Sequence, residues 1–587
     1  MSGRRPLVLA FCGLVLLWAG LFLPTLGQLP LIRSEAMYAQ IPLEMLATGD
    51  WLTPRLNGAR YLDKPPLLYW FNLAAFILGG VSDHAVRLAT FLLGLGEALA
   101  ACILGTLMFS GRSGWLAGGM LLSSIGFFAL HLQMLADHLI TLSLSWSIVC
   151  LWLWWRRERA GAVAGFFSCL WLGLMSKGLI GLLFPLAIAG LFALLTGAAR
   201  WRRFLLHPWG WLGLAAAALP WFILMEWRHP GFLAYQVLNE QFSRFLGHRS
   251  PPDVNSMTLG TFWLFVSVWL MPWTPYLPAG IASLWPRRWP PDAEEAPGVL
   301  LFLWAGVVLA FFSLSSSRIE YYSLPALPAL ALMVARRWDR YLSEPDSRVM
   351  LLSSWLYAVF VLGLLALVPL LEQVCTDNRR EFNGMFVHFQ PLVPYAAPIL
   401  AVLSLLLIVG SWRRRPGFSL CCLSGTALTL LVFTFLCFRL LSPQLSDAWA
   451  GQAIRQAAGP ADLVVMGHIE EFEYGMCLRY YAGRSILMVQ RDGLPAFGFP
   501  LTPRENYLIS PDTLAGLWQG PQRVFVLMDD CDPEPYLTGG QIVQAAGGKR
   551  LVVNRPLAAE LPPASLSTSG TDSPFQPPSA VAPPRRP

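Results

Sequence analysis

Long apolar segments alternate with short polar segments from the N-terminus to about residue 441. Each apolar segment holds about 18 residues or more, which lets an α-helix cross the roughly 30 Å of hydrocarbon in a bilayer. The pattern therefore predicts a polytopic α-helical membrane protein with about thirteen transmembrane helices. These helices are expected at residues 7–27, 84–108, 114–131, 136–155, 161–176, 178–197, 208–226, 259–284, 298–315, 320–336, 350–370, 395–412 and 418–441.

The first of these helices could also be read as a signal peptide, because Arg4 and Arg5 precede its apolar run. That run is about 20 residues long, however, and it lacks a clear cleavage site between small residues. We therefore expect a retained signal-anchor helix.

The first external loop, residues 28–83, is too long to be a simple turn. Within it, residues 35–48 repeat apolar side chains about one helical turn apart, which predicts a short amphipathic helix lying along the membrane surface. The pair Asn57-Gly58 marks a turn further along the loop. Two more long loops are predicted at residues 227–258 and 371–394.

The chain after residue 441 follows a different pattern. Short apolar runs (ADLVVM, RSILMVQ, QRVFVLM and RLVVN) alternate there with helix-like and turn segments, which predicts the strands of a small α/β domain. The last residues are rich in Pro, Ser and Thr and are expected to be disordered. The predicted parts are a membrane domain over residues 1–441, an external domain over 442–560 and a tail over 561–587.

The composition agrees with a membrane protein. Of the 587 residues, 55% are hydrophobic and 13% are charged, whereas a soluble domain has about 25% charged residues. The mean hydropathy of +0.52 has the same cause. Most of the chain is therefore not solvated by water.

Clusters of arginine give the orientation in the membrane. With thirteen spans, the N-terminus and every second loop lie on one side, and that side is rich in Arg, as expected for the cytoplasm. The N-terminus is therefore expected in the cytoplasm and the domain after residue 441 outside. The net charge of +7 reflects this topology and does not indicate nucleic acid binding. The clusters lie at residues 4–5, 112, 156–159, 200–203, 287–288, 336–340, 348 and 413–415.

The ten cysteines show no disulfide framework and no metal-binding pattern. Seven of them fall in predicted spans, where Cys is usually a small apolar side chain. Cys477 and Cys531 lie in the predicted external domain and could pair.

Lysine is rare, which makes its positions informative. Of 42 Lys and Arg residues only three are Lys, namely Lys64, Lys177 and Lys549. Lys carries a compact point charge, whereas Arg presents a broad planar fork. A site that needs one ammonium group against a phosphate oxygen would explain Lys64 and Lys177 on the outer face. The alternative is chance retention of lysines that snorkel at helix ends.

Three acidic residues are predicted near the same outer face. Glu35 follows the first span, Asp63 precedes Lys64, and Asp137 begins the fourth span between His131 and His138. Acids at the membrane edge are costly to desolvate, so they are functional candidates. They could supply a general base or hold a divalent cation. The alternative is that they simply face water, or that Asp137 is a charge favoured at a helix N-terminus.

Basic and aromatic residues are also predicted on the outer face. Arg244 and Arg249 lie in the second long loop, and Arg318 and Tyr321 lie where the ninth and tenth spans meet. Such groups suit an anionic lipid-phosphate substrate, and they would equally suit an anion transporter.

Several segments, in order along residues 30–335, together resemble the aminoarabinose transferase group of the dolichyl-phosphate-mannose protein mannosyltransferase family. That family belongs to the GT-C glycosyltransferases. The longest segment is SEAMYAQIPLEMLATGDWLTPRLNGARYLDKPPLLYW, residues 34–70, which resembles the family's first external loop. The others are MLADHLITL (134–142), LMSKG (174–178), NEQFSRF (239–245), MPWTPYLP (271–278) and FFSLSSSRIEYYSLPALPALAL (311–332).

The resemblance implies a GT-C enzyme that takes a sugar from a polyprenyl-phosphate carrier and transfers it to an acceptor at the outer face. In aminoarabinose transferases the acceptor is a lipid A phosphate. By position, Glu35 and Asp137 would be the catalytic acids and Asp63 a metal or polar ligand. The resemblance also implies membrane lipids as partners, and we expect a monomer. Carrier phosphate or sugar would contact Lys64, Tyr61, Tyr38, Lys177, Arg244, Arg249, Arg318 and Tyr321.

Three positions depart from the family pattern. Ser34 stands where the family has its leading catalytic Asp, Gln241 where aminoarabinose transferases tend to have His, and Arg318 where many members have Lys. Loss of the Asp fits a phosphate acceptor, which is already ionised near neutral pH, slightly better than a hydroxyl acceptor.

The sequence leaves four functional interpretations open. The first is transfer of 4-amino-4-deoxy-L-arabinose or another sugar to lipid A or another cell-envelope acceptor. The others are a protein or glycan mannosyltransferase, a transporter or flippase for a lipid-linked anion, and a non-catalytic member of the family. A transporter would place its charges near mid-membrane on broken helices, whereas these charges are predicted at the outer edge.

Overall fold

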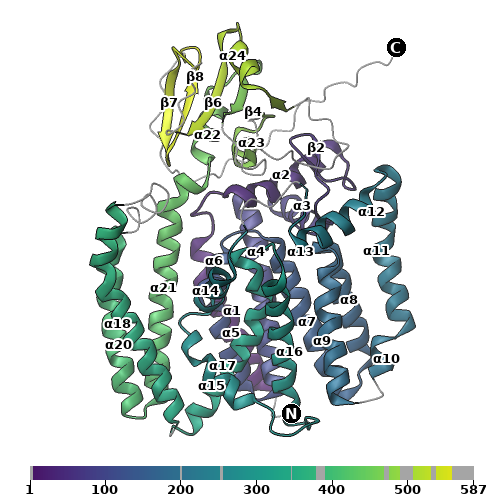
Figure 1. Ribbon diagram of the computed structural model, residues 1–587, viewed down its shortest axis with the longest axis vertical. Coiled ribbons are helices and arrows are strands. Elements are labelled where there is room, and N and C mark those ends of the chain that lie inside the picture. The colour runs from purple at the N-terminus through teal and green to yellow at the C-terminus, as the bar shows by residue number, and fades with distance from the viewer. Residues whose placement is uncertain are drawn as a thin grey trace. The chain divides into compact units, whose positions relative to one another are not determined.

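A computed structural model describes residues 4–197, 201–250, 256–345, 347–377, 390–467, 475–489, 507–529 and 537–557. Helices dominate its first part, and six of its strands lie near the C-terminus (Figure 1). The chain forms two compact units. The first comprises residues 1–25 and 90–441, and the second comprises residues 26–89 and 442–587. Each unit is described by itself.

The helices of the described residues are α1 Arg4–Phe22, η1 Leu23–Thr25, α2 Arg33–Thr48, α3 Leu67–Gly79, α4 Asp83–Met108, α5 Gly111–Leu122, α6 Ile125–His131, α7 Ala136–Arg157, α8 Ala160–Lys177, α9 Ile180–Thr196, α10 Trp201–Leu205, α11 Pro208–Arg228, α12 Phe232–Ala234, η2 Tyr235–Ser243, α13 Arg244–Leu246, α14 Leu259–Trp269, η3 Thr274–Tyr276, α15 Leu277–Leu284, α16 Ala296–Leu314, η4 Glu320–Ala326, α17 Leu327–Ser343, α18 Arg348–Asp377, η5 Gln390–Leu392, α20 Val393–Trp412, α21 Pro416–Leu445, α22 Ala448–Ala457, α23 Met476–Ala482 and α24 Pro511–Gln519. The strands are β1 Arg55–Leu56, β2 Ala59–Arg60, β3 Leu463–Met466, β4 Leu487–Val489, β5 Leu508–Ile509, β6 Val524–Asp529, β7 Gln541–Ala546 and β8 Lys549–Val553.

The predicted multi-span character is confirmed. Among the described residues, eight helices are long and apolar enough to cross a membrane, or nine if the bent pair α5 and α6 is one span. These two helices meet at 58° within the single predicted span at 114–131. Three of the four shorter apolar helices lie in predicted spans, whereas the fourth, Leu67–Gly79, lies in the predicted first external loop. The number thirteen therefore stays a prediction.

Two predicted spans are interrupted where proline occurs. The span expected at 259–284 is divided into α14, the 3-10 turn η3 and α15, with Pro272 and Pro275 between the two α-helices. The span expected at 320–336 begins as the 3-10 helix η4, which contains Pro325, and becomes α-helical at α17. Proline lacks an N–H and its ring clashes with the preceding turn, so it kinks or breaks many α-helices.

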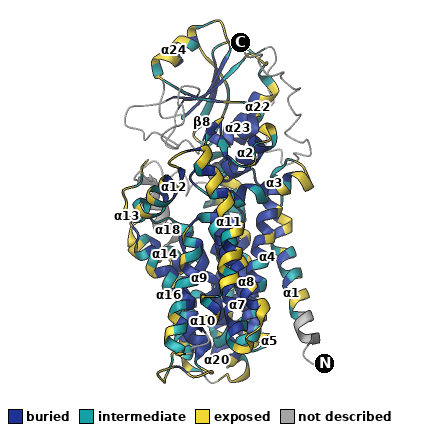
Figure 2. Ribbon diagram, turned by 90° about the vertical axis from the view of Figure 1, so that its right-hand side faces the viewer, coloured by how far each residue is buried: buried dark blue, intermediate teal, exposed yellow. Residues whose placement is uncertain are grey.

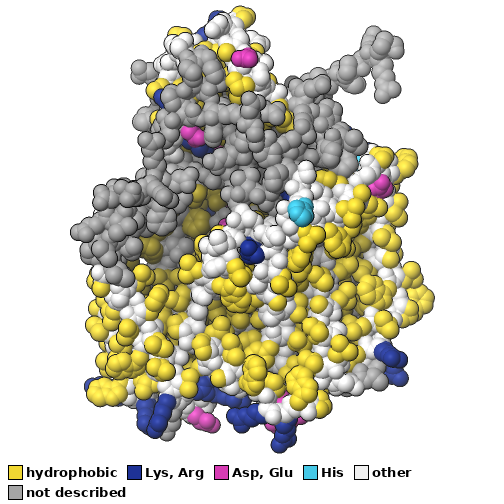
Figure 3. All heavy atoms as spheres, viewed as in Figure 1, with side chains coloured by type: hydrophobic (Ala, Val, Ile, Leu, Met, Phe, Trp, Pro, Cys, Tyr) yellow, Lys and Arg dark blue, Asp and Glu magenta, His cyan; other side chains and the backbone are white. Residues whose placement is uncertain are grey.

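The first unit is a bundle of packed helices. Helix α8 contacts α7, α9 and α11, and α17 contacts α5, α15 and α16. Many residues between these helices are buried, whereas many residues of α11 are exposed (Figure 2). On the face shown in Figure 3, hydrophobic side chains form a broad band over this unit, and Lys and Arg gather along its lower edge. An apolar band with basic groups at one edge is the surface expected of a polytopic membrane protein.

The second unit contains a six-stranded sheet of order β5-β4-β3-β6-β8-β7. Strands β5, β4, β3 and β6 are parallel, whereas β8 is antiparallel to both β6 and β7. Each of the four predicted apolar runs supplies one strand, namely β3, β4, β6 or β8, so the predicted α/β domain is confirmed. The core of the sheet includes Val465, Val489, Val526 and Val552.

The first external loop belongs to this same unit. Helix α2 forms where the amphipathic helix was predicted, but it packs against α3 and α23. Ala36 to Met45 are all buried, including the polar Gln40 and Glu44. Residues on both faces of this helix are therefore buried by protein, and its position along the membrane surface stays a prediction.

A buried carboxylate joins α2 to the rest of the unit. Glu44 accepts hydrogen bonds from the N–H groups of Asn57 and Gly58 at 2.8 and 2.9 Å, and it pairs with Arg479 of α23 at 2.9 Å. Arg479 also donates to Asn57 Oδ1 at 2.8 Å, and Asn57 Nδ2 donates to the carbonyl oxygen of Ile486 at 2.9 Å. The predicted turn is thus the tip of the β1–β2 hairpin, with φ of +53° at Asn57 and +80° at Gly58. Positive φ at both positions suits an Asn-Gly pair.

We expect Glu44→Gln to destabilise the second unit. The change leaves Arg479, which is only 13% exposed, without its carboxylate, and breaking a largely buried pair in this way costs about 3 kcal/mol. Thermal unfolding of the purified protein in detergent should show a lower midpoint for Glu44→Gln than for wild type. Asp512→Asn, at an exposed position in the first turn of α24, is the matched control and should unfold as wild type does. Equal midpoints for all three proteins would contradict the structural role of Glu44.

Candidate functional site

An ion pair joins two of the predicted site residues in the first unit. Lys177 Nζ lies 2.7 Å from Asp137 Oδ1 and 2.8 Å from Asp137 Oδ2. Both side chains are largely shielded from solvent, with exposed fractions of 12% for Lys177 and 4% for Asp137. The structure therefore brings together the acid and the lysine that the sequence proposed independently.

Helix termini position this pair. Asp137 lies in the first turn of α7, and Lys177 is the last residue of α8, which packs beside α7. The helix dipole favours a carboxylate at an N-terminus and an ammonium at a C-terminus, so the backbone stabilises both charges. Gly178 ends α8 with φ of +77°, and a Cβ at this position would lie 2.9 Å from Gln241 Nε2.

Aromatic and amide groups surround Lys177. Its ammonium lies 4.3 Å from the ring centroid of Tyr322, and its backbone carbonyl accepts a hydrogen bond from Gln241 Nε2 at 3.4 Å. Tyr321, the predicted member of this tyrosine pair, meets Tyr322 edge-on with ring centroids 5.3 Å apart. The residue that touches Lys177 is thus the neighbour of the one predicted.

The predicted basic residues of the second long loop share a partner. Glu240, which is buried, pairs with Arg249 Nε at 2.8 Å and with Arg244 Nη1 at 3.4 Å. Arg318 instead donates to the backbone carbonyl oxygens of Met257, at 3.1 Å, and of Ser315. These contacts link residues within the loops. Whether the three arginines contact a phosphate stays a prediction.

In the second unit, Lys64 and Tyr38 form a second cluster. Lys64 Nζ donates to Tyr38 Oη at 2.7 Å and lies 5.2 Å from the centroid of the same ring. Tyr38 stacks on Tyr69, and its backbone carbonyl accepts a hydrogen bond from Asn72 at 3.0 Å. Helices α2 and α3 therefore fix the position of the hydroxyl that receives Lys64. Tyr61 and Asp63 lie in the same segment as Lys64, and both are buried.

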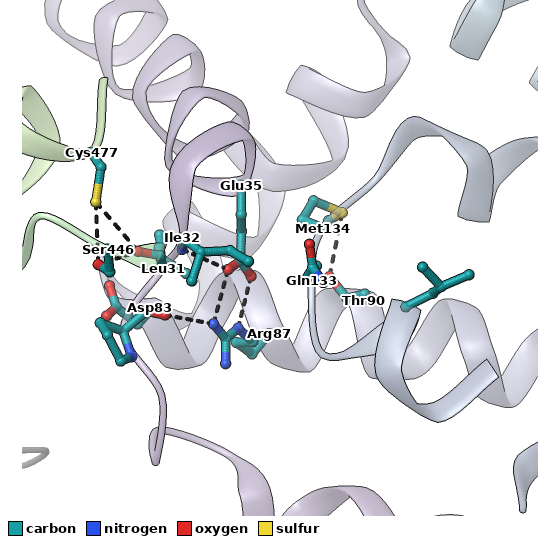
Figure 4. Close-up of polar contacts among 12 residues, drawn as sticks. Leu31, Ile32, Glu35, Asp83, Arg87, Thr90, Gln133, Met134, Ser446 and Cys477 are labelled. Atoms are coloured by element: carbon teal, nitrogen blue, oxygen red, sulfur yellow. Dashed lines mark hydrogen bonds and ion pairs between the residues drawn. The ribbon is translucent and has the colours of Figure 1, made fainter. Parts of the chain in front are cut away.

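Glu35 has a different environment from the one predicted. Its two carboxylate oxygens accept hydrogen bonds from Arg87 at 2.7 and 2.9 Å, and one also accepts from the N–H of Ile32 at 3.2 Å (Figure 4). Both side chains are 1% exposed. A carboxylate held in this way is not available as a general base, so the geometry favours a structural role for Glu35 over the catalytic role suggested by the sequence.

The segment before Glu35 is held by the C-terminal part of the same unit. The N–H of Leu31 donates to Tyr481 Oη at 2.6 Å, and Tyr481 donates to Asp83 at 2.5 Å. Burial raises the pKa of the Tyr481 phenol well above its ordinary value, so the hydroxyl keeps its proton. Ser446 and Cys477 also contact Leu31 through its carbonyl oxygen (Figure 4).

The predicted divalent cation fits these carboxylates poorly. Both oxygens of Glu35 face Arg87, and both oxygens of Asp137 face Lys177, so cationic side chains already neutralise them. Asp63 as a metal ligand stays a prediction. The side chain of Ser34 and the whole of Cys531 lie outside the described parts of the chain, while Cys477 is buried with a free thiol.

Sequence reasoning missed two partners, Arg87 and Glu240. Arg87 was counted within an apolar span, and its charge there was a signal that some carboxylate must accompany it. Glu240 lies inside a segment quoted for the family resemblance, but no local pattern separates it from its neighbours. Only the fold shows which of these side chains meet.

Comparison with known proteins gives these clusters a context. The model of the dolichyl-phosphate-mannose-protein mannosyltransferase family matches residues 30–236. An undecaprenyl phosphate-α-4-amino-4-deoxy-L-arabinose arabinosyl transferase of Pseudomonas fluorescens is 32% identical over 421 residues, which cover 66% of this chain and 73% of that protein. The transferase of Aeromonas salmonicida with the same activity in its name is 30% identical over 59% of this chain, and the match spans 64% of that relative's length.

A solved structure shows the same fold. The crystal structure of ArnT from Cupriavidus metallidurans bound to undecaprenyl phosphate aligns with a TM-score of 0.75 and 21% sequence identity. The alignment covers 93% of this chain and 98% of that one. The described architecture is therefore of the GT-C type, as the sequence predicted.

We expect removal of one partner of the Asp137–Lys177 pair to cost more than removal of both charges. Lys177→Met leaves a buried carboxylate without its ammonium, which typically costs about 3 kcal/mol, whereas Lys177→Met combined with Asp137→Asn leaves no uncompensated charge. Thermal unfolding in detergent should therefore place the midpoint of the double variant above that of Lys177→Met. A double variant that is less stable than Lys177→Met would argue against the pair.

Proposed function

This chain belongs to the aminoarabinose transferase family of GT-C glycosyltransferases, and we propose that it transfers a sugar from a polyprenyl-phosphate carrier to a cell-envelope acceptor. The proposed sugar is 4-amino-4-deoxy-L-arabinose, and the proposed acceptor is a lipid A phosphate. The names of the relatives support this choice, as does the undecaprenyl phosphate bound to the related crystal structure.

The observation that carries the proposal is the arrangement of Lys64 with Tyr38. The sequence almost always uses Arg for a cation, yet it places a single Lys here against a phenol that α2 and α3 hold in position. An ammonium held at a fixed point suits one phosphate oxygen, because it acts as a point charge. Tyr38 adds a hydroxyl that could bind the same phosphate or the sugar.

The proposed reaction is a direct displacement at the anomeric carbon. An acceptor oxygen forms a bond to this carbon as the bond to the carrier's phosphate oxygen breaks, and the electron pair of that bond stays on the polyprenyl phosphate. Lys64 stabilises the negative charge that develops there. Asp137, which pairs with Lys177, would orient the acceptor.

Glu35 has a positioning role in this proposal. Its pair with Arg87 fixes the start of α2, the helix that carries Tyr38. Ser34 stands where the family has a catalytic Asp. In this proposal Glu35 does not take over the role of that Asp, because its carboxylate is paired with Arg87. An acceptor phosphate that is already ionised would need no such base.

The proposed location follows from the arginine pattern. We propose that the N-terminus faces the cytoplasm of a bacterial inner membrane and that the sheet-containing C-terminal domain is periplasmic. The gathering of Lys and Arg along one edge of the first unit supports this orientation (Figure 3). A protein or glycan mannosyltransferase is the second candidate, because the mannosyltransferase family model matches residues 30–236.

Transfer can be tested with the purified full chain in nanodiscs. We expect it to move aminoarabinose from undecaprenyl phosphate to lipid A, detected by mass spectrometry as a matching loss of donor and gain of modified lipid A. Undecaprenyl phosphate-mannose with a peptide acceptor tests the second candidate in parallel. If neither donor is consumed under conditions that keep the protein folded, the transferase proposal fails.

Lys64→Met should lower kcat/KM for the donor by about 100-fold or more, because loss of one preorganised charge at a developing anion costs about 2.7–4 kcal/mol. Lys64→Arg should recover only part of this loss, since the guanidinium is larger and planar. Lys549→Arg is the control. Lys549 pairs with Asp447 at 2.6 Å in the second unit, and Arg can keep that pair, so its activity should match wild type. Normal transfer by Lys64→Met would remove Lys64 from the site.

A further inference from the structure

Three buried side chains of the first unit form a cluster that the proposed transfer reaction does not use. Glu97 lies on α4, His131 is the last residue of α6, and His138 is in the first turn of α7. One ligand atom from each residue lies within 4.8 Å of the others, and His131 Nε2 is 3.5 Å from Glu97 Oε1. All three residues have an exposed fraction of 0%.

The tautomer of each histidine follows from its hydrogen bonds. His131 Nδ1 is 2.7 Å from the carbonyl oxygen of Phe127, and a carbonyl oxygen can only accept, so Nδ1 carries the proton and Nε2 carries a lone pair. His138 Nε2 is 2.9 Å from the carbonyl oxygen of Gln133, so here Nε2 is protonated and Nδ1 carries the lone pair. The two lone pairs belong to the nitrogen atoms that have no backbone partner.

These lone pairs face a carboxylate that also lacks a donor. Glu97 Oε1, Glu97 Oε2, His131 Nε2 and His138 Nδ1 are all buried and have no hydrogen-bond partner among the described residues. Burying four acceptor atoms without a donor in an apolar interior destabilises the folded protein. A cation or a proton bound between these atoms would offset this destabilisation.

A glycine and three aromatic rings pack around His131. Gly94 lies on α4 one turn before Glu97, and a Cβ there would lie 2.7 Å from His131 Cδ2, so only glycine leaves room for the ring. The rings of Phe127 and His138 each lie with their centroid 4.0 Å from that of His131, and Phe22 meets it edge-on. Apolar side chains thus exclude water from the cluster, and backbone carbonyls orient both imidazoles as they do around metal-bound histidines.

We propose that Glu97, His131 and His138 bind a divalent transition-metal ion of the zinc class. Two neutral imidazole nitrogens and one carboxylate form a three-residue zinc ligand set, with bonds of about 2.0–2.1 Å. Tetrahedral bonds of that length place ligand atoms about 3.4 Å apart, which is close to the 3.5 Å between His131 and Glu97. Magnesium and calcium prefer oxygen ligands and do not suit the two imidazoles.

The ion would have a structural role. It would join α4 to the turn between α6 and α7, which leads directly into Asp137. The three ligands lie within the first unit, and the inference does not depend on the transfer reaction. The competing occupant is a proton on Glu97, which would donate to His131 Nε2 and leave no metal.

Metal content tests the proposal directly. The full chain, purified with a tag free of histidine and washed with chelator, is loaded with zinc, desalted and measured by elemental mass spectrometry. We expect one zinc ion per chain. Glu97→Gln and His138→Gln should each weaken binding by more than about 100-fold, because even loss of a second-shell partner costs 10–100-fold. The control His207→Asn changes a histidine that caps α11 away from the cluster and should keep the ion.

X-ray absorption at the zinc edge of the wild-type protein covers the case in which the variants fail to fold. A shell of two imidazole nitrogens with one or two oxygen ligands supports the site. Sulfur ligands, or an all-oxygen shell, would overturn it. Zinc retained equally by wild type and by both cluster variants would also overturn it. A wild-type protein without zinc, whose infrared spectrum has a protonated carboxyl band that Glu97→Gln removes, would assign the cluster to the proton instead.

Discussion

Asp137 and Lys177 lie 2.7 Å apart among helices whose other side chains are largely apolar. Such surroundings offer almost no water to a charge, and an isolated buried ion costs several kcal/mol that only a close partner can offset. This constraint explains two charged clusters of the first unit. Arg244 and Arg249 both pair with the buried Glu240. Asp137 lies at the N-terminus of α7 and Lys177 at the C-terminus of α8, where the helix dipoles favour their charges.

The same constraint divides the predicted site residues into two groups. Glu35 is paired with Arg87 on both carboxylate oxygens, so its charge is used to hold α2 in place. Lys64 donates a hydrogen bond to the hydroxyl of Tyr38, which fixes the position of the ammonium. The proposed phosphate contact rests on this fixed position.

The first external loop and the C-terminal domain fold as one unit although more than 350 residues separate them in the sequence. Glu44 illustrates the cause, because one carboxylate receives two N–H groups of the β1–β2 turn and the guanidinium of Arg479. Tyr481 and Ser446 make similar contacts with Leu31. The C-terminal domain therefore helps to shape the loop that carries Lys64, which gives it a structural reason to exist whatever acceptor the enzyme uses.

The sequence by itself determined the class of this protein, most of its helices and four of its strands. Hydrophobic runs and alternation are local signals, because burial in lipid or in a sheet acts on consecutive residues. Strands β5 and β7 escaped prediction because one has two residues and the other is largely exposed, so neither has an apolar pattern to detect. The breaks at η3 and η4 were also readable in principle, since each contains or follows a proline.

Only the tertiary structure decided what the chemical residues do. The partners of Asp137 and Glu35 lie 40 and 52 residues away, and no spacing rule relates residues on different helices. The rarity of lysine pointed to Lys64 and Lys177, yet it could not show that one meets a phenol and the other a carboxylate. His131 and His138 were noticed only as neighbours of Asp137, and Glu97 was not noticed at all. Their convergence depends on how α4, α6 and α7 pack, which is a property of the folded chain.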